Sequence, residues 1–139
     1  MNTSDYNVLE QLPTVEEFCT LRKQVGWGDT DPSLAEISLT NTLYCVCIRR
    51  SSQLLATGRV IGDGAMYFYL QDIIVDTEFQ GQGQGHAVMM KIETYLHQAA
   101  KKGATIGLFV AQGREALYGR YGYTPRPSET LGHGMCKFV

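Results

Sequence analysis

Glycine occupies every second position from residue 81 to residue 85, directly after an apolar run and directly before a helical pattern. The preceding run, Met66 to Val75, is rich in aromatic and β-branched residues and predicts a strand. The following apolar residues recur at the spacing of one helix face: Val88, Ile92, Tyr95 and Ala99. The three glycines therefore lie in a turn between a strand and a helix.

This glycine turn has the properties of an anion site. The first N–H groups of a helix have no partner within it, and residues 80–86 contain no Ser, Thr, Asp or Asn that could cap them. The helix dipole favours negative charge at this end, and glycine lets a ligand approach the backbone closely. We expect a phosphate or pyrophosphate here. A merely flexible connection is the alternative, and the amphipathic helix that follows at once disfavours it.

The two common nucleotide motifs are absent. A G-x-G-x-x-G fingerprint would place its last glycine at His86 or Val88, and no G-K-[ST] sequence exists. Instead, Gln80, Gly83 and Gly85 fill the pattern Q-x-x-G-x-G, and the stretch Leu117 to Tyr123 (LYGRYGY) follows about thirty residues later. Together with the D-I-I-V strand, these motifs resemble the GCN5-related N-acetyltransferase (GNAT) superfamily over most of the chain.

Length and periodicity predict one domain over residues 1–139, of α+β (mixed α/β) class. A single central sheet, mixed but mostly antiparallel, should carry helices on both faces, as the resemblance also implies. The expected helices are Thr14 (cap) to Gly26, Pro32–Leu39, the long helix after Gly85 and Arg114–Arg120. The expected strands are Leu43–Arg49, Leu54–Ile61, Met66–Val75, a parallel strand Ala104–Ala111, and two more around the loop Pro125–Gly134.

The composition of the chain bears on whether it binds nucleic acid or a membrane, and on its cellular compartment. The net charge of −2 and a pI near 5.9 leave no broad basic surface for nucleic acid. No apolar stretch approaches a membrane span and the first residues show no signal pattern, so we expect a cytoplasmic protein without membrane association. We interpret Cys19, Cys45, Cys47 and Cys136 as reduced core or near-core thiols without a metal, a zinc site being the alternative.

The resemblance implies that acetyl-CoA binds at the glycine turn. Its pantetheine arm would pair with the strand edge at Ile73, Ile74 and Val75. Its pyrophosphate would lie against the loop residues Gly81, Gln82, Gly83, Gln84, Gly85 and His86, with Gln80 fixing the loop.

The resemblance also places Tyr118 beside the CoA sulfur, where a phenol can protonate or solvate the leaving thiolate. The alternative is a packed tyrosine, which is the interpretation for Tyr121 and Tyr123. The family's glutamate and asparagine near the later strand are absent, so the base is open. Asp72, a carboxylate within an apolar run, is a candidate base; alternatively it braces a loop or pairs with Arg59.

Aromatic residues could line the acceptor pocket, namely Trp27, Tyr67 and Tyr69, although each could equally be core. Arg22, Arg59 and Arg126 could bind an acidic acceptor group or be surface charges. The leading hypothesis is direct acetyl transfer from acetyl-CoA to a primary amine, with a small-molecule acceptor favoured. The alternative is a non-catalytic module that binds acyl-CoA. The resemblance to the family also implies a possible homodimer.

Overall fold

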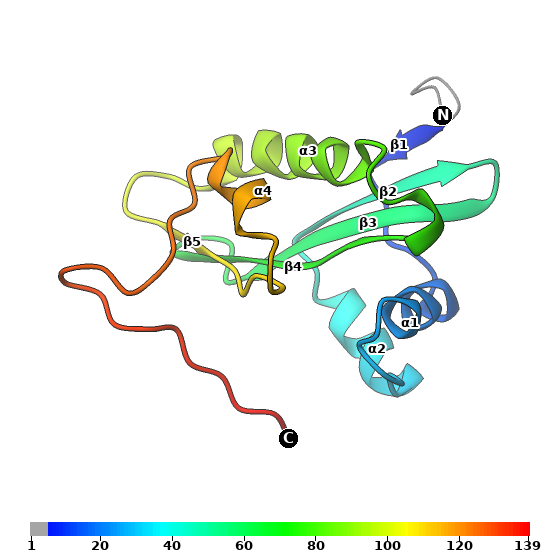
Figure 1. Cartoon of the computed structure of the whole chain (residues 1–139), viewed down its shortest axis with the longest axis horizontal. Coiled ribbons are helices and arrows are strands. Elements are labelled where there is room, and N and C mark those ends of the chain that lie inside the picture. Colours follow the sequence, from blue (N-terminus) through cyan, green and yellow to red (C-terminus); the bar gives the residue numbers. More distant parts are fainter. Residues whose placement is uncertain (1–5) are drawn as a thin grey trace.

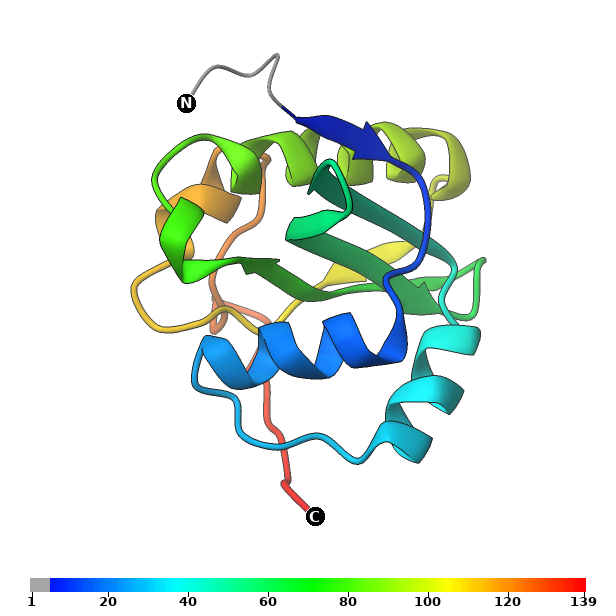
Figure 2. The same cartoon turned by 90° about the vertical axis from the view of Figure 1, so that its right-hand side faces the viewer.

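A five-stranded sheet in the order β1-β2-β3-β4-β5 forms the centre of the fold (Figure 1). The computed structural model describes residues 6–139. Helices cover both faces of the sheet, with α3 and α4 on one side and α1 and α2 on the other (Figure 2). The elements are β1 (Asn7–Leu9), α1 (Val15–Gln24), α2 (Pro32–Thr40), β2 (Tyr44–Arg50), β3 (Gln53–Gly62), β4 (Tyr67–Val75), η2 (Thr77–Phe79), α3 (Gln84–Ala99), β5 (Thr105–Gly107) and α4 (Glu115–Gly119).

The predicted fold class is confirmed. Strands β2, β3 and β4 form an antiparallel meander, and β5 returns parallel to β4 after the α3 crossover. The pairing of β4 with β5 joins Tyr67–Tyr69 to Thr105–Gly107. Strand β4 therefore continues to Val75 after its neighbour on that side has ended, and this divergence positions the site described below.

Helix α3 packs closely against the centre of the sheet. Its buried residues Val88, Met89 and Ile92 belong to the larger core, which lies between α3 and the inner strands. Gly58 of β3 permits this approach, since a Cβ there would lie 2.5 Å from the Val88 side chain. Any larger residue at this position would push the helix away from the sheet.

The opposite face is covered by α1 and α2. The predicted capping box is present, because Thr14 Oγ1 accepts from Glu17 N and the Glu17 carboxylate accepts from Thr14 N. Leu21 of α1 packs with Cys45, Cys47 and further residues of the sheet, Leu54 and Ile74. A separate cluster, formed by Phe18, Ala35 and Leu39, joins α1 to α2.

Several element predictions are wrong. β1 was not predicted, and the strand expected over Ala104–Ala111 is only three residues long. The two expected strands near the C-terminus do not form, and residues 120–139 contain no strand. A strand requires a neighbour for its backbone groups, and within residues 6–139 the segment 124–139 forms one backbone hydrogen bond, from Ser128 N to Leu131 O.

Three of the four cysteines lie in or beside the core, as predicted. Cys45 and Cys47 are buried on one face, with each sulfur within 3.7 Å of Thr57 Oγ1. Cys19 is half-buried, but Cys136 is exposed, which contradicts its prediction as a core thiol. Its expected strand does not form, so nothing covers it. Among the described residues, no three His, Cys, Asp or Glu side chains gather as metal ligands would.

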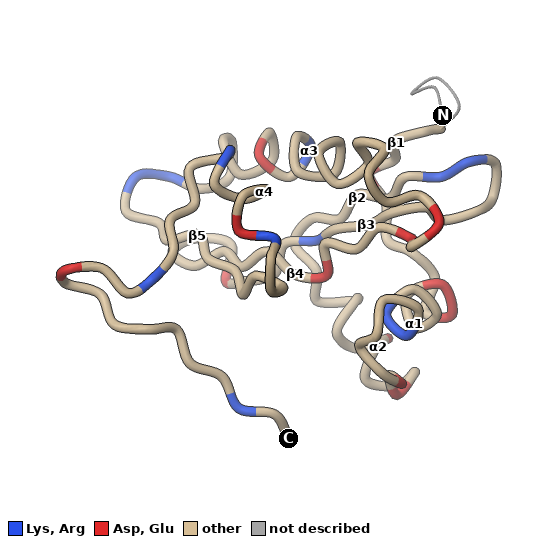
Figure 3. The backbone as a smooth tube through the Cα atoms, viewed as in Figure 1, with Lys and Arg blue, Asp and Glu red and all other residues tan. Residues whose placement is uncertain are grey.

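The surface charges are dispersed. Figure 3 shows Lys and Arg spread over loops and helix ends, with Asp and Glu among them. Within residues 6–139, no helix combines the length and apolar character needed to cross a membrane.

Candidate active site

A cavity of about 530 Å³ lies where β4 diverges from β5. It brings together most of the residues predicted from the sequence: Trp27, Ile73, Ile74, Val75, Gln80, Gly81, Gly83, Gln84, Gly85, His86 and Tyr118. Four predicted site residues do not line it, namely Gln82, Tyr67, Tyr69 and Asp72. The remaining lining residues were not predicted: Val25, Ala111, Arg114, Leu117 and Arg120.

The glycine turn exposes the start of α3. Gly81 and Gly83 have φ values of 78° and 91°, and a Cβ at either position would meet nothing within 4 Å. Gly83 is the N-cap residue and offers no side chain to the first helical amides. The first bond of the helix is donated by Ala87 N to Gly83 O at 3.0 Å, so the amides of Gly85 and His86 precede the intrahelical ladder. This arrangement suits an anion.

Two further features hold the turn in place. Gln80 Nε2 donates to Val75 O at 3.1 Å, which ties the loop to the end of β4. At the other side, the Tyr121 hydroxyl and His86 Nδ1 form a hydrogen bond, which joins the start of α3 to the segment after α4. Side-chain contacts on both sides therefore fix the position of the glycine turn.

The end of β4 offers an open backbone edge. On the side facing β5, the part of β4 after Tyr69 has no strand partner among the described residues. A bulge at Asp72, where Thr57 and Arg59 of β3 pair with Ile74 and Gln71, bends the strand within this stretch. Ile73 to Val75 can therefore accept a peptide-like chain along the edge, as an added strand would lie.

Tyr118 lies between two cavities. The residue is 8% exposed and lines both the first cavity and a second one of about 890 Å³ beside β5. Burial raises the pKa of the phenol above 10, although the Arg114 charge acts in the opposite direction. The hydroxyl is therefore a neutral hydrogen-bond donor at physiological pH.

Asp72 is buried among cations instead of facing the cavity. Arg22 Nη1 donates to its Oδ1, and Arg59 Nε donates to its Oδ2 at 2.9 Å. The pairing with Arg59, which was one of the alternatives to a role as base, is present, and Arg22 adds a second partner from α1. The remaining N–H groups of Arg59 reach Ser38 and Thr42 at the end of α2. Asp72 also has φ 56°, a left-handed conformation that Asp tolerates better than most residues.

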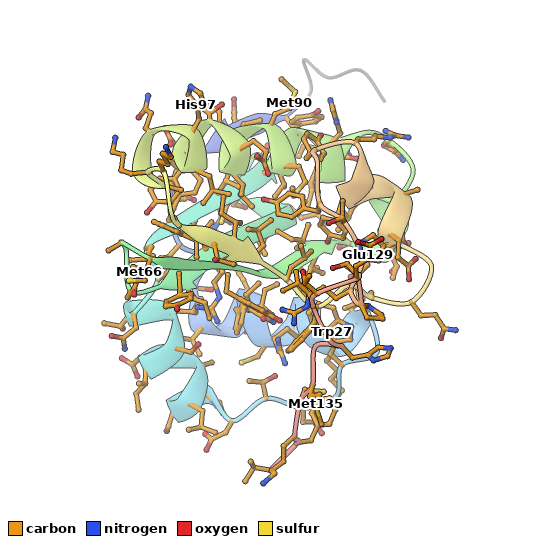
Figure 4. The ribbon with its side chains drawn as sticks, turned by 90° about the vertical axis from the view of Figure 1, so that its left-hand side faces the viewer. Trp27, Met66, Met90, His97, Glu129 and Met135 are labelled. Atoms are coloured by element: carbon orange, nitrogen blue, oxygen red, sulfur yellow. The ribbon has the colours of Figure 1, made fainter. Side chains whose placement is uncertain are left out.

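Trp27 is placed at the cavity by the end of α1. Gly26 (φ 88°) ends the helix, and Trp27 N returns to bond Arg22 O at 2.9 Å. Trp27, labelled in Figure 4, is 40% exposed. Its ring lies 5.2 Å from the Arg22 guanidinium. Tyr69 lines only the second cavity, where its hydroxyl accepts from Phe109 N, and Tyr67 lies 59% exposed outside both cavities.

Arg114 and Arg120 add positive charge to the cavity from either end of α4. Within the described lining of this cavity there is no carboxylate. Because the field of these cations adds to that of the α3 N-terminus, the cavity favours a ligand with several negative charges. Their position on both sides of the LYG sequence is the signal that could have identified them.

The fold and this cavity define an acetyltransferase of the GNAT type, and comparison with known proteins agrees. The family model for the acetyltransferase (GNAT) domain matches residues 29–138. The chain therefore belongs to the GNAT family and is an N-acetyltransferase.

Individual relatives support this assignment. The chain is 25% identical over 135 residues to an uncharacterized N-acetyltransferase, ycf52, of Porphyra purpurea, covering 94% of this chain and 72% of the relative. A Staphylococcus aureus protein of unknown function assigned to the acetyltransferases is 30% identical, with a TM-score of 0.88 over 96% of this chain and 99% of that one. A GNAT family protein of Streptococcus pneumoniae shares the fold, with 23% identity and a TM-score of 0.76 over 96% and 98% of the two chains.

Proposed function

We propose that this enzyme transfers an acetyl group from acetyl-CoA directly to a primary amine of a small molecule. The observation that carries this proposal is that one cavity contains an uncapped helix start behind two left-handed glycines, an open strand edge and a buried tyrosine. Acetyl-CoA supplies the activated thioester. The residues present fit its three chemical parts: amides and arginines for phosphates, a backbone edge for the amide chain, and a hydroxyl for the sulfur.

Tyr118 stabilises the leaving sulfur by a hydrogen bond. A thiol has a pKa of about 8.5, whereas burial holds the pKa of Tyr118 above 10. Full transfer of the phenolic proton to the thiolate is therefore uphill. Tyr118 acts chiefly as a preorganised donor, and the sulfur takes its proton from solvent or from the amine.

Asp72 acts as a positioning residue. Both of its oxygens already accept from guanidinium groups, so it has no role as the base that deprotonates the acceptor amine. The described lining of the first cavity contains no carboxylate, and the ring of His86 is held by its Nδ1 bond to Tyr121 at the glycine turn, so in this proposal the amine loses its proton to water. The buried thiols Cys45 and Cys47 suit a reducing compartment, and we place the enzyme in the cytoplasm.

A matched pair of glycine substitutions tests this function. Gly83 (φ 91°) and Gly103 (φ 100°) flank the two ends of α3, and a Cβ at either meets nothing within 4 Å. Gly83→Ala and Gly103→Ala should therefore cost similar stability, about 1 kcal/mol. Only Gly83→Ala should weaken CoA binding, because the strained left-handed residue shifts the turn and moves an amide away from the phosphate; one lost charge-assisted hydrogen bond is worth about 1.5–3 kcal/mol, which is about tenfold or more in affinity.

Calorimetric titration with CoA and acetyl-CoA gives the affinities, and release of free thiol with a panel of amines gives turnover. Equal CoA affinity of the two variants, or no heat of binding to the unsubstituted protein, would refute the proposed site. CoA binding without thiol release from any amine would refute the proposed acceptor class.

A further inference from the structure

A cluster of three charged side chains beside the cavity carries more positive than negative charge. Arg22 Nη1 and Arg59 Nε both donate to the carboxylate of Asp72, so two cations share one anion. The other N–H groups of Arg59 donate to neutral oxygens of Ser38 and Thr42. The side chain of Arg59 is 6% exposed, whereas that of Arg22 is 24% exposed. The excess positive charge is therefore accessible through Arg22.

Part of the Arg22 guanidinium has no protein partner. Its Nε donates to Thr30 Oγ1 at 3.1 Å and its Nη1 donates to Asp72, but within residues 6–139 its Nη2 donates to no acceptor. The guanidinium also lies 5.5 Å from the ring centre of Phe18 and 5.2 Å from that of Trp27. These contacts fix its position before any ligand binds, which lowers the entropic cost of binding.

Arg22 lies at the end of the cavity where the acetyl group of the bound coenzyme should arrive, a step that rests on the proposed function. The glycine turn follows β4, and the free edge of β4 runs back from Val75 to Ile73. A ligand with its phosphates at the turn and its amide arm on this edge directs its far end to the bulge at Asp72. Val25 and Trp27, after α1, line the same cavity.

We propose that Arg22 binds an anionic group of the acceptor, which is then a small amine that also carries a carboxylate or a phosphate. The anion accepts from Arg22 Nη2 and balances the excess charge of the cluster. The indole N–H of Trp27, which has no partner within residues 6–139, is a second donor on this wall. The other arginines considered from the sequence fit less well: Arg59 is enclosed, and Arg126 lines the second cavity, where it donates to Gly132 O.

Matched pairs of acceptors test this inference on the unsubstituted protein. Thiol release gives kcat/KM for glycine against glycinamide, β-alanine against β-alaninamide, and aminoethyl phosphate against ethanolamine, at equal concentrations of free amine. In at least one pair the anionic member should react about tenfold or more faster, because it gains a charge-assisted hydrogen bond. The pair with the largest ratio identifies the anion. Similar values within every pair would overturn the inference while leaving the acetyl transfer intact.

Substitutions assign the preference to Arg22. Arg22→Gln should abolish it by raising the KM of the anionic acceptor, and Arg22→Lys should retain part of it, because the charge remains. The matched control is Lys23→Gln, since Lys23 is the next residue of α1 and pairs with Asp29 at the surface. This variant should keep the full preference. Calorimetric titration with CoA shows that each variant is folded and binds the coenzyme. A preference that survives in Arg22→Gln would contradict the inference.

A binding measurement decides the inference even if no amine gives turnover, an outcome that would refute the proposed function alone. Trp27 is the only tryptophan of the chain, so its fluorescence reports binding beside Arg22. The probes are the N-acetylated forms of the same six compounds, with CoA present. An acetylated anion should give a saturable change that its neutral counterpart lacks and that Arg22→Gln removes. The same change with both members of each pair, or no change with any anion, would show that Arg22 binds no such group.

Discussion

Replacing Asp72 by asparagine separates a structural role of this carboxylate from a catalytic one. The side chain is 1% exposed and accepts from both Arg22 and Arg59. An amide of the same shape offers one acceptor oxygen and presents an NH₂ group to the second guanidinium. The destabilisation is greatest at Arg59, because its side chain is only 6% exposed and its charge cannot be solvated by water.

The cost follows from the burial. Removing one partner of a buried ion pair costs about 3–5 kcal/mol. For a chain of this length, each kcal/mol lowers the melting temperature by roughly 3–4 °C, so Asp72→Asn should melt about 10 °C or more below the unsubstituted protein. The matched control is Asp29→Asn, whose 87% exposed carboxylate pairs with Lys23 at 3.1 Å. It should change stability by less than about 1 kcal/mol.

Thermal unfolding followed by circular dichroism gives the stabilities, and thiol release at about 15 °C, where the variant is folded, gives kcat. A positioning role for Asp72 requires a large loss of stability. If Asp72→Asn unfolds like the unsubstituted protein but loses about a factor of 10³ in kcat, Asp72 is the base and the positioning role is wrong. The pH profile of the reaction with the amine also distinguishes the two roles of Asp72. A base on the enzyme adds a loss of rate at low pH, which a positioning residue does not cause.

Three further outcomes follow from the site and the first helix. Tyr118→Phe should lower kcat by about 10²-fold with CoA affinity nearly unchanged, as measured by thiol release and calorimetry, because one donor to developing charge is lost. Arg114→Gln should weaken CoA binding about tenfold and reduce its salt dependence, whereas Lys102→Gln, outside the cavity, should do neither. Hydrogen bonding from Arg49 lowers the pKa of Glu17 from 4.5 to about 2, so this stabilisation is complete above pH 4.5 and is lost as the pH falls towards 2. Chemical unfolding across that range should show the stability difference between the native protein and Glu17→Gln shrinking to nothing at the acid end.

The glycine turn was predictable because its signals are local. A strand, three alternating glycines and an amphipathic helix lie within about thirty residues, and each follows from backbone chemistry alone. The capping box of α1 is equally local, with its two partners three residues apart. Distant contacts are present in both places, from Arg49 to Glu17 and from Tyr121 to His86, and they are compatible with the local preference.

The wrong predictions concern segments whose structure or role depends on contacts with distant parts of the chain. The C-terminal segment, residues 131–139, is apolar enough to form a strand, but composition does not specify a neighbouring strand, and within the described chain none pairs with it. Arg114 and Arg120 gain their meaning only when α4 is placed against the start of α3. A three-residue strand such as β1 is too short for any period to show.

Asp72 connects the two sides of the site. Its left-handed conformation creates the bulge in β4, and the bulge lies three residues after the last pair between β4 and β5. The two arginines that hold this conformation come from α1 and β3, and α1 lies on the side of the sheet away from α3. Fixing a buried charge at that point therefore fixes the direction of the free edge from Ile73 to Val75. Asp72, which the sequence presents as a candidate base, contributes to function by setting the shape of β4.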